Sequence, residues 1–438
     1  MARGKKAAQG LKPEEKLAQA LVPVEEQPYQ IPENWCWIHL PEAFTNHTDS
    51  KKKIQSKAYL SDGKYSVVDQ GQELIGGYTD DKDMLYSGKL PVIIFGDHTR
   101  CVKLIDFPFV QGADGVKVLR PKEFYDINAF YYSLRAINIP NLGYRRHFPL
   151  FSQFAIPLPP LNEQHRIVDR IESIFAKLDE AKEKAQTVVD GFELRKSAIL
   201  HKAFTGELTA KWREEHGMTL DRWTKSTFSD VVDEFKYGLS EKSDYGYDGI
   251  PVFRIPNVTD NGLSFDDLKY LSHSQIDSSS LLRKDDVLII RSNGSKELVG
   301  KSVLVPSLDK EYTYASFLIR ARLNTKIVPA YFVYYINSSD ARIQMFKKAK
   351  SSAGINNINS KELGAINILV CSVSEQSEIV RILDEFLDKE NAAKEAAEAV
   401  LDQIDTMKKA VLARAFRGEL GTNDPTEESA VELLKSVL

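Results

Sequence analysis

The sequence predicts an α+β protein in which two strand-rich domains are joined by two long helices that form an antiparallel coiled coil. Three observations support this prediction. Residues 163–208 recur as residues 375–420 at a constant offset of 212, with 19 identities in 46 aligned positions and no insertion. Both copies place apolar residues at alternating spacings of four and three, which is the pattern of a coiled coil. The stretch before each copy contains short apolar runs that are typical of strands.

A chain of 438 residues is too long for one hydrophobic core, so the repeat is also a guide to domain boundaries. We expect an N-terminal helical segment (1–34), domain 1 (35–161), a first long helix (162–208), a linker (209–222), domain 2 (223–373), a second long helix (374–420) and an acidic C-terminal tail (421–438).

The first copy of the repeat predicts a single long helix. Its apolar stripe, interrupted by Arg195, consists of Ile167, Ile171, Ile174, Leu178, Ala181, Ala185, Val188, Phe192 and Ile199. Pro159-Pro160 cannot continue a helix backwards, Asn162 can cap its first turn, and Gly206 suits its end. At 1.5 Å per residue, a helix over 163–204 would be about 60 Å long.

The second copy predicts an equivalent helix between Ser374 and Gly418. Its stripe, interrupted by Glu390, consists of Ile379, Leu383, Phe386, Ala393, Ala397, Val400, Ile404, Met407 and Val411. An apolar stripe needs a partner, and the simplest partner is the other copy in the same chain. Two ordinary core helices are the alternative, but the length and the regular spacing favour a coiled coil.

The two domains share features although they differ in length. Domain 1 opens at Trp35 and domain 2 at Trp223, and each ends in alternating apolar residues just before the Glu-Gln that starts the repeat. Residues 92–95 and 287–290 are apolar runs that predict buried strands. The aromatic-rich segments 129–134 and 330–336 predict amphipathic helices that pack on the sheet, and such aromatic stripes favour a core over a surface for stacking bases.

Composition predicts a soluble protein of a reducing compartment, and we expect it in the cytoplasm. The chain is 42% hydrophobic and 27% charged, without a run of 18 apolar residues, and its start shows no secretion signal. The three cysteines form no CxxC pair. The net charge of −4 is uneven: domain 1 has 15 basic against 13 acidic residues, domain 2 has 19 against 17, and residues 375–438 have 8 against 15. This distribution permits a nucleic-acid partner for the domains without demonstrating one.

The order domain, long helix, domain, long helix resembles the specificity (S) subunits of type I restriction–modification systems, the HsdS family. The resemblance covers nearly the whole chain. It is carried by Leu158-Pro-Pro-Leu-Asn-Glu-Gln164 and Ala203-Phe-Thr-Gly-Glu-Leu208, by 91–100 and 112–119 in domain 1, and by 286–294 and 299–305 in domain 2.

The resemblance implies a DNA-binding subunit with two target-recognition domains. Each domain would read one half of a bipartite target in double-stranded DNA, and the helices would set the distance between the halves. Two methyltransferase subunits would bind this chain to form an adenine-N6 methyltransferase, and restriction (translocase–nuclease) subunits would complete the type I endonuclease. S-adenosylmethionine, ATP and Mg would bind those partner subunits and not this chain.

Base reading requires side chains that present paired donors or acceptors from loops, such as Arg and Lys to guanine or Asn and Gln to adenine. The candidates in domain 1 are Asp97, His98, Thr99 and Arg100 after the predicted strand, and Tyr144, Arg145 and Arg146 beside Gly143. The candidates in domain 2 are Arg291, Asn293, Ser295 and Lys296, and Asn356, Asn357 and Asn359 after Gly354. Arg and Asn in turns often cap their own backbone, which is the structural alternative for these residues.

The sequence lacks the residues that catalysis would require, so we expect a non-catalytic chain. Residues 294–302 resemble a phosphate-binding loop, but five residues instead of four separate its glycines. No cluster of His and Cys has the spacing of metal ligands. The alternative function is a coiled-coil adaptor whose two domains dock other proteins. We also hypothesise that the segments 1–34 and 421–438 contact a methyltransferase subunit, because their apolar residues need cover; these are Leu17, Leu21, Val431, Leu434 and Leu438.

Overall fold

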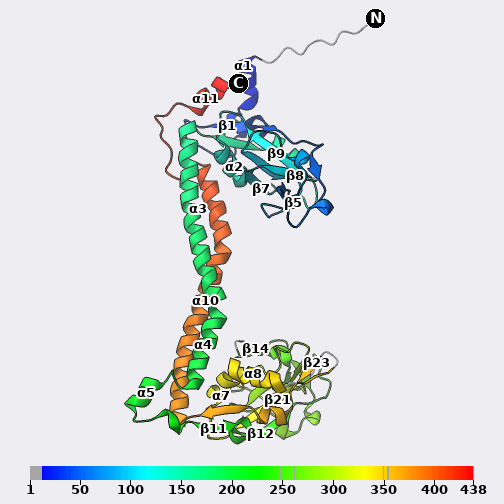
Figure 1. The fold of residues 1–438 in the computed structure, drawn as a ribbon, viewed down its shortest axis with the longest axis vertical. Helices are drawn as coiled ribbons and strands as arrows, with labels where there is room; N and C mark the ends of the chain where they lie inside the picture. Colours follow the sequence, from blue (N-terminus) through cyan, green and yellow to red (C-terminus); the bar gives the residue numbers. More distant parts are fainter. Residues whose placement is uncertain are drawn as a thin grey trace. The chain divides into compact units, whose positions relative to one another are not determined.

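The structure is a computed structural model that describes residues 12–113, 115–246, 248–260, 262–348, 350–352 and 355–437. The chain divides into two compact units, one formed by Met1–Ala185 with Ala399–Leu438 and the other by Gln186–Glu398. Unit 1 contains domain 1 and unit 2 contains domain 2, and each unit also holds part of both long helices (Figure 1).

Domain 1 is built on two four-stranded sheets and one strand pair. The first sheet has the order β2 (Phe44–Asn46), β9 (Val116–Pro121), β6 (Val92–Gly96), β7 (Val102–Ile105). The second has the order β3 (Lys53–Ile54), β8 (Phe109–Gly112), β4 (Tyr65–Val68), β5 (Gly77–Thr79). β1 (Cys36–His39) pairs antiparallel with β10 (Ala155–Leu158), and helix α2 (Ile127–Ala136) covers the first sheet.

Domain 2 has a comparable central sheet and more small sheets. The central order is β12 (Val232–Tyr237), β21 (Leu318–Leu323), β17 (Val287–Ile290), β19 (Ser302–Leu304). The smaller sheets are β16 (Lys269–Leu271), β13 (Ile250–Phe253), β20 (Thr313–Tyr314); β14 (Val258–Thr259), β15 (Gly262–Leu263); and β18 (Ser292–Asn293), β23 (Ile355–Asn357), β22 (Lys350–Ser352). β11 (Thr224–Thr227) pairs with β24 (Asn367–Val370). The helices are α6 (Phe228–Val231), α7 (Pro329–Asn337), α8 (Ser339–Lys348) and α9 (Ser360–Gly364).

Both predicted buried strands occupy the centre of a sheet, as β6 and β17. Side chains of a strand alternate between its two faces, and here both faces are covered. Ile93 and Phe95 of β6 enter the core that α2 shares with the long helix, whereas Ile94 enters a second core. Ile289 and Ile290 of β17 separate in the same way. Double coverage explains why these strands are continuously apolar. The two predicted amphipathic helices are also confirmed, as α2 and α7.

The repeat folds into long helices, but the prediction of a single helix for the first copy is wrong at Gly191. The first copy forms α3 (Leu161–Asp190) and α4 (Phe192–Thr205), which meet at Gly191, and the second forms α10 (Val373–Ala415) (Figure 1). The chain leaves α4 at Gly206 and passes Gly418 after α10 with positive φ angles of 83° and 75°, a region that favours glycine.

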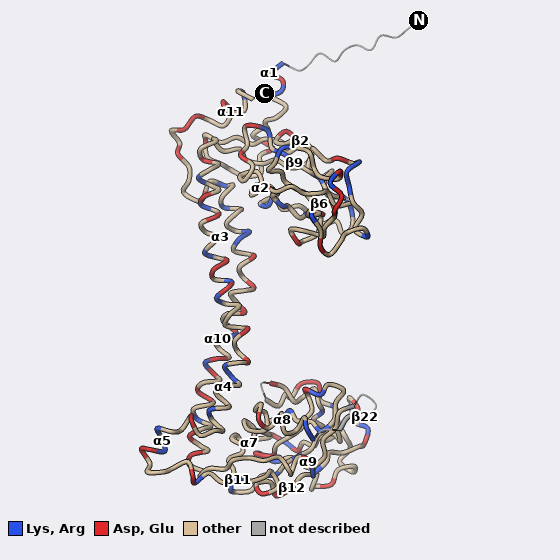
Figure 2. Tube along the Cα trace, viewed as in Figure 1, with Lys and Arg blue, Asp and Glu red and all other residues tan. Residues whose placement is uncertain are grey.

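The helices run antiparallel within each unit. In unit 1, Lys408 of α10 pairs with Asp179 of α3 at 2.5 Å. In unit 2, the buried side chain of Leu200 from α4 shares a core with Ile379 and Leu383 from α10. Figure 2 shows charged residues of both signs along α3 and α10, as expected for the solvated faces of a coiled coil.

Part of the predicted stripe on the second helix is wrong by one residue. Ala393, Val400 and Met407 are exposed, whereas Leu387 is buried and Leu401 is half-buried. Apolar residues occupy adjacent positions at several of these turns, so the heptad pattern alone does not decide which one faces the partner helix. In the pairs Phe386-Leu387 and Val400-Leu401, the C-terminal member is the more buried one.

Each domain is attached to the start of one long helix by the same contacts. The indole Nε1 of Trp35 donates a hydrogen bond to Oε2 of Glu163 at 2.6 Å. The next residue, Gln164, donates its amide to the carbonyl of Phe124 at 3.0 Å and accepts from the backbone N–H of Asp126 at 2.7 Å. The Glu-Gln pair at the start of the repeat therefore fixes domain 1 to α3.

Domain 2 repeats this arrangement on α10. Trp223 donates Nε1 to Glu375 at 3.0 Å, and Gln376 donates its amide to the carbonyl of Lys326 at 3.0 Å while accepting from the N–H of Val328 at 2.7 Å. We refer to these two sets of contacts as joint 1 and joint 2.

The joints differ in what neutralises the buried carboxylate. Arg213 of α5 (Ala210–Glu215) donates to Glu375 at 2.6 Å, and both side chains are buried. Glu163 instead accepts from neutral donors, including the amide of Asn423 at 2.9 Å, and burial raises its pKa above the ordinary value. A buried carboxylate without an ion-pair partner in its hydrogen bonds favours its neutral form.

The terminal segments pack on joint 1. Helix α1 (Pro13–Ala20) contacts α11 (Ala430–Val437), and Ala20 and Leu434 are buried in the core that holds Trp35. The chain itself buries Leu434 and half-buries Leu17, Leu21 and Val431, so the premise that these segments need cover from another protein is wrong for Leu434. Leu438 and the first eleven residues of the predicted N-terminal segment lie outside the described residues.

Candidate nucleic-acid interface

The loop that follows β6 in domain 1 contains four of the predicted readers, and Asp97 is the most buried of them. Its side chain is only 3% exposed. Oδ1 accepts from the backbone N–H of Phe148 at 2.7 Å, and the Asp97 carbonyl accepts from the N–H of His147 at 2.8 Å. Asp97 therefore holds two loops of the domain together, and its carboxylate is withdrawn from the surface where it was predicted to read a base.

His98 connects the two predicted loops of domain 1. Its ring stacks on that of Tyr144, with centroids 4.9 Å apart and planes 13° from parallel, and Nδ1 lies 3.2 Å from the Tyr144 carbonyl oxygen. Tyr144 is 87% exposed, and Arg145 and Arg146 beside it are exposed as well. The structure thus brings together two loops separated by more than forty residues and presents two cations beside a stacked pair of rings.

Thr99 and Arg100 point back into the domain. Thr99 Oγ1 donates to the carbonyl of Gln70 at 2.5 Å, and Arg100 Nη1 donates to the carbonyl of Ile139 at 3.0 Å. Arg100 also has a φ of 63°, which an L-residue other than glycine adopts only when its surroundings hold it there. The positions predicted for base reading thus include residues that shape the loop. Gln70, which also accepts from the His98 N–H at 3.1 Å, was not found from the sequence because nothing in its local pattern distinguishes it.

The two predicted loops of domain 2 form one small sheet. β18 pairs antiparallel with β23, so that Ser292 faces Asn357 and Asn293 faces Asn356. Asn293 accepts from the N–H of Ser295 at 2.8 Å, and Asn356 donates its amide to the carbonyl of Gly294 at 3.1 Å. These two asparagine side chains therefore stabilise the turn between the loops, as the structural alternative expected.

Asn359 is a helix cap. Its Oδ1 accepts from the N–H of Glu362 at 2.8 Å, and the Glu362 side chain accepts from the N–H of Asn359 at 2.9 Å, which is a capping box at the start of α9. The side-chain oxygen of Asn359 is thus already engaged. Ser295 and Lys296 are exposed on the adjacent turn, whereas Gly354 lies outside the described residues.

Arg291 is half-buried between the end of β17 and the start of β18. Its Nε and Nη2 each lie 3.4 Å from Oδ1 of Asn357, and its guanidinium carbon lies 4.5 Å from the centroid of the Tyr237 ring. Tyr237 was missed because it lies far from both loops in the sequence, at the end of β12. The alternation of β12 could have indicated an outward aromatic residue, but not its contact with Arg291.

Two segments of the chain match the same known family. The model of the type I restriction modification DNA specificity domain matches residues 32–188 and 221–403, which together make up more than half of the sequence. This chain belongs to that family. Each match contains one domain and a large part of the helix that follows it, so the internal repeat found in the sequence is a repeat of the family's specificity domain.

Curated specificity subunits of type I restriction enzymes are similar to this chain. The chain is 30% identical over 275 residues to the type I restriction enzyme EcoKI specificity subunit of Escherichia coli (strain K12), which covers 62% of this chain and 58% of that one. It is 25% identical over 383 residues to the EcoR124I/EcoR124II specificity subunit of Escherichia coli, covering 80% and 86%. The match with the first of these thus spans little more than half of that relative's length.

Solved structures show the fold of this specificity-domain protein. The HsdS subunit from Thermoanaerobacter tengcongensis aligns with a TM-score of 0.60 at 19% identity, covering 90% of this chain and all of that one. A chain from a study of complex assembly and conformational transition of the type I R-M system aligns with a TM-score of 0.63 at 19% identity and the same coverage.

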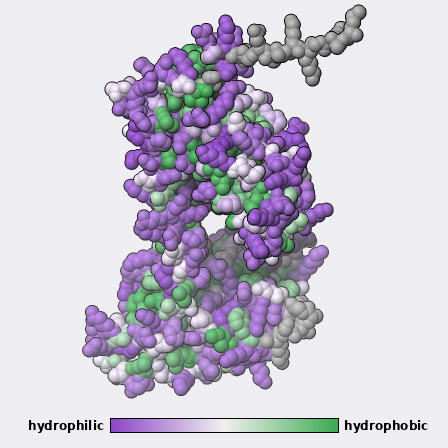
Figure 3. Space-filling model, turned by 45° about the horizontal axis from the view of Figure 1, so that its top comes forward, coloured by the Kyte–Doolittle hydropathy of each residue, from purple (hydrophilic) through white to green (hydrophobic). Residues whose placement is uncertain are grey.

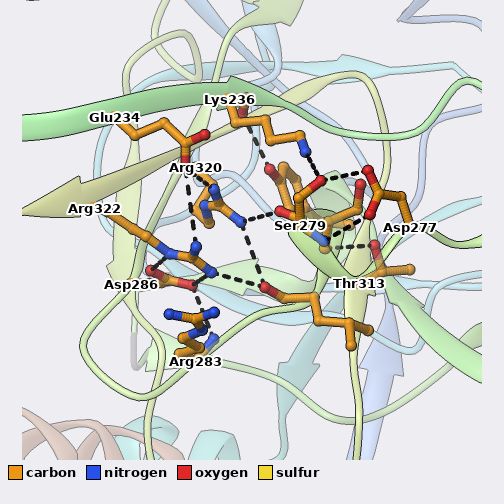
Figure 4. Close-up of polar contacts among 12 residues, drawn as sticks. Glu234, Lys236, Asp277, Ser279, Arg283, Asp286, Thr313, Arg320 and Arg322 are labelled. Carbon is orange, nitrogen blue, oxygen red and sulfur yellow. Dashed lines mark hydrogen bonds and ion pairs between the residues drawn. The ribbon is translucent and has the colours of Figure 1, made fainter.

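A network of charged and polar side chains links the central sheet of domain 2 to the segment around Ser279 (Figure 4). Arg320, which is fully buried, donates to Glu234 and, at 2.8 Å, to the carbonyl of Ser279. Arg322 donates to the buried Asp286 at 2.9 Å. Both arginines project from β21, the neighbour of β17 in the central sheet, so this network holds the strand that leads to Arg291.

The described residues give no indication of a metal site or of a membrane-spanning helix. Among the described residues, no group of three or more His, Cys, Asp and Glu could hold a metal ion. None of the described helices has both the length and the apolar character needed to cross a membrane. The face drawn in Figure 3 is largely hydrophilic, with apolar residues in small areas between polar ones.

Proposed function

We propose that this chain is the specificity subunit of a type I restriction–modification complex and reads a bipartite DNA target. Each domain contacts one half-site with its loop surface. In domain 1 the surface comprises His98 and Tyr144–Arg146, and in domain 2 it comprises Arg291–Lys296 with Asn356 and Asn357. The observation that supports this most is the duplication itself. Two domains with unlike loop surfaces are attached to the long helices by equivalent contacts, joint 1 and joint 2.

In this proposal the long helices set the separation of the half-sites. Joint 1 and joint 2 fix each domain to a helix through a buried tryptophan–glutamate contact, so a domain cannot swivel freely on its helix. Two readers on one duplex must match its helical repeat of roughly 34 Å per turn. A stiff connection makes the spacer length a part of the specificity, because a wrong spacer requires the DNA to be twisted or stretched.

The chain would recruit two methyltransferase subunits, and restriction subunits would join through that core. Val400 and Met407 on α10 support a protein contact on the helices, because they are 42% and 44% exposed although apolar. The chain itself would be non-catalytic: S-adenosylmethionine, ATP and Mg would bind the partner subunits. The complex would act in the cytoplasm on double-stranded DNA.

The proposal is tested by sequencing adenine methylation in a host with and without this gene, in the presence of the methyltransferase gene. We expect one interrupted, asymmetric motif that depends on the gene. A footprint of the assembled complex should show two protected patches on DNA carrying that motif. A coiled-coil adaptor predicts neither result, so the absence of both the motif and the footprint would overturn the proposal.

A further inference from the structure

Arg291 is held in position by contacts of its backbone and of its guanidinium. Its backbone N–H donates to the carbonyl of Phe317 at 3.0 Å, and its carbonyl accepts from the N–H of Ile358 at 2.9 Å. The guanidinium contacts one edge of Asn357 and one face of Tyr237. Tyr237 is itself fixed, because its hydroxyl accepts from the backbone N–H of Ser360 at 3.0 Å. The side chain is thus ordered before any partner arrives, which reduces the entropy cost of binding.

The charge of Arg291 is not neutralised by its partners. Arg320 and Arg322 of the neighbouring strand β21 each donate to a carboxylate, Glu234 or Asp286 (Figure 4). Arg291 instead donates to the neutral amide oxygen of Asn357 and stacks on a neutral ring. An arginine that served only the fold would gain more from a carboxylate. The arrangement holds a full positive charge at a half-buried position of the loop surface.

The contacts also leave donors free for a ligand. A guanidinium has five N–H groups in a planar fork, and the contacts with Asn357 involve Nε and Nη2. The fork that remains includes Nη1, for which the described residues provide no hydrogen-bond acceptor. Paired donors in one plane match the O6 and N7 acceptors of guanine in the major groove.

We propose that Arg291 reads a guanine in the half-site of domain 2, and that Asn357 and Tyr237 are positioning residues for it. This rests on the proposed function and names the base that one residue of that surface recognises. It also reassigns Asn357. An asparagine reads adenine with both its amide nitrogen and its oxygen, and here the oxygen is already occupied by Arg291.

The test maps the methylated motif in cells that express the full chain with its methyltransferase subunits. Wild-type protein should show an invariant guanine in one half-site. Arg291→Gln and Arg291→Lys should each relax that single position, with discrimination against the other bases reduced on the order of 10-fold or more. The rest of the motif and the spacer should not change.

Variants of the positioning residues separate reading from folding. Asn357→Ala and Tyr237→Leu should relax the same guanine, whereas Tyr237→Phe, which keeps the ring under the guanidinium, should retain the wild-type motif. A merely structural defect would lower methylation at every position alike. The matched control is Lys284→Gln, which removes an exposed cation at the opposite end of β17 and should leave the motif unchanged.

The outcomes distinguish this inference from the proposed function. If wild-type protein yields no interrupted motif, the proposed function fails. If it yields one and the Arg291 variants leave every position intact, or relax a position that is not guanine, the inference is overturned while the function stands. Should Arg291→Gln abolish methylation, Arg291→Lys decides the question, because a lysine keeps the charge but not the planar fork.

Discussion

Arg195 Nε donates to Glu390 Oε2 at 2.7 Å, so the two charged residues that interrupt the apolar stripes of the long helices form an ion pair with each other. A single polar layer of this kind specifies the register of a coiled coil, because any shift leaves both groups without a partner. Arg195 also donates Nη2 to the carbonyl of Val188 at 2.9 Å.

Breaking this ion pair on one side should destabilise unit 2. We expect Glu390→Leu to lower the free energy of unfolding by about 1–2 kcal/mol. The substitution removes the carboxylate acceptor of Arg195 in a partly buried layer. The double variant Arg195→Leu/Glu390→Leu should recover most of that loss. Urea denaturation followed by helical circular dichroism measures both. Glu385→Leu, at an exposed pair with Arg381, is the control and should leave the free energy of unfolding nearly unchanged, because solvent screens an exposed pair. Equal costs for Glu390→Leu and the control would contradict the role of the pair.

Removing the carboxylate charge should have unequal effects at the two joints. Glu375→Gln leaves the buried Arg213 without its ion-pair partner, and we expect a loss of about 3 kcal/mol or more in the free energy of unfolding. Glu163→Gln removes a carboxylate whose donors are neutral, so its cost should be at most about 1 kcal/mol. The comparison uses the same denaturation assay. A larger loss in the free energy of unfolding for Glu163→Gln than for Glu375→Gln would contradict this assignment of the buried charges.

The pH dependence of stability should carry a contribution from Glu163. Burial raises the pKa of Glu163 in the folded state above its ordinary value, so the folded chain binds this proton more tightly than the unfolded chain. The associated stability is fully present below the unfolded pKa and is lost as pH rises through the folded pKa. The difference in free energy of unfolding between wild type and Glu163→Gln should therefore shift in favour of wild type as pH falls from about 7 to about 5. A difference that stays constant over this range would show that Glu163 titrates normally.

Arg145 and Arg146 should contribute to DNA affinity without contributing to sequence choice. They are exposed and adjacent, and nothing described holds them in one orientation, which suits contacts with phosphates. The double variant Arg145→Gln/Arg146→Gln should reduce the slope of log affinity against log salt by about 1–2 in the assembled complex. Fluorescence anisotropy over a salt series measures the slope. The methylated motif should stay the same, and a changed motif would show that one of them reads a base.

Charge introduced at the exposed apolar positions of α10 should impair assembly. Val400→Lys and Met407→Lys should each lower the yield of the complex with methyltransferase subunits in co-purification, because a buried lysine without a partner is unfavourable at an interface. Asp405→Lys is the control, since it places the same group at an exposed polar position of α10. Full assembly of both variants would place the partner contact elsewhere.

The long helices and the central strands could be predicted because their signals are repeated or continuous. The Glu-Gln at the start, the glycine at the end and the constant offset are independent signals that locate the two helices in the sequence. β6 and β17 were found because burial on both faces removes polar residues from the run. The position of the stripe on α10 was less certain, since adjacent apolar residues such as Val400 and Leu401 satisfy the pattern equally well.

The loop surfaces were located from the sequence, but the roles within them were not. The sequence places Asp97 and Tyr144 in loops of the same domain without showing that one turns inward and the other outward. Contacts such as Tyr237 with Arg291 join residues more than fifty positions apart, and pattern reasoning has no access to such pairs. Asn359 followed three residues later by Glu362 is a capping signature, and this signal could have separated it from Asn356 and Asn357.

The matching joints have a consequence for how new targets could arise. Each joint uses the tryptophan at the edge of its domain, main-chain groups inside the domain and the Glu-Gln that follows, and none of the residues proposed to face DNA. An exchange of coding sequence between Trp35 and Gln164, or between Trp223 and Gln376, would deliver a whole domain with these joint residues, while Asn423 and Arg213 stay in the rest of the chain. If the proposed function holds, such an exchange would replace one half of the recognised sequence and leave the other half and the spacer in place.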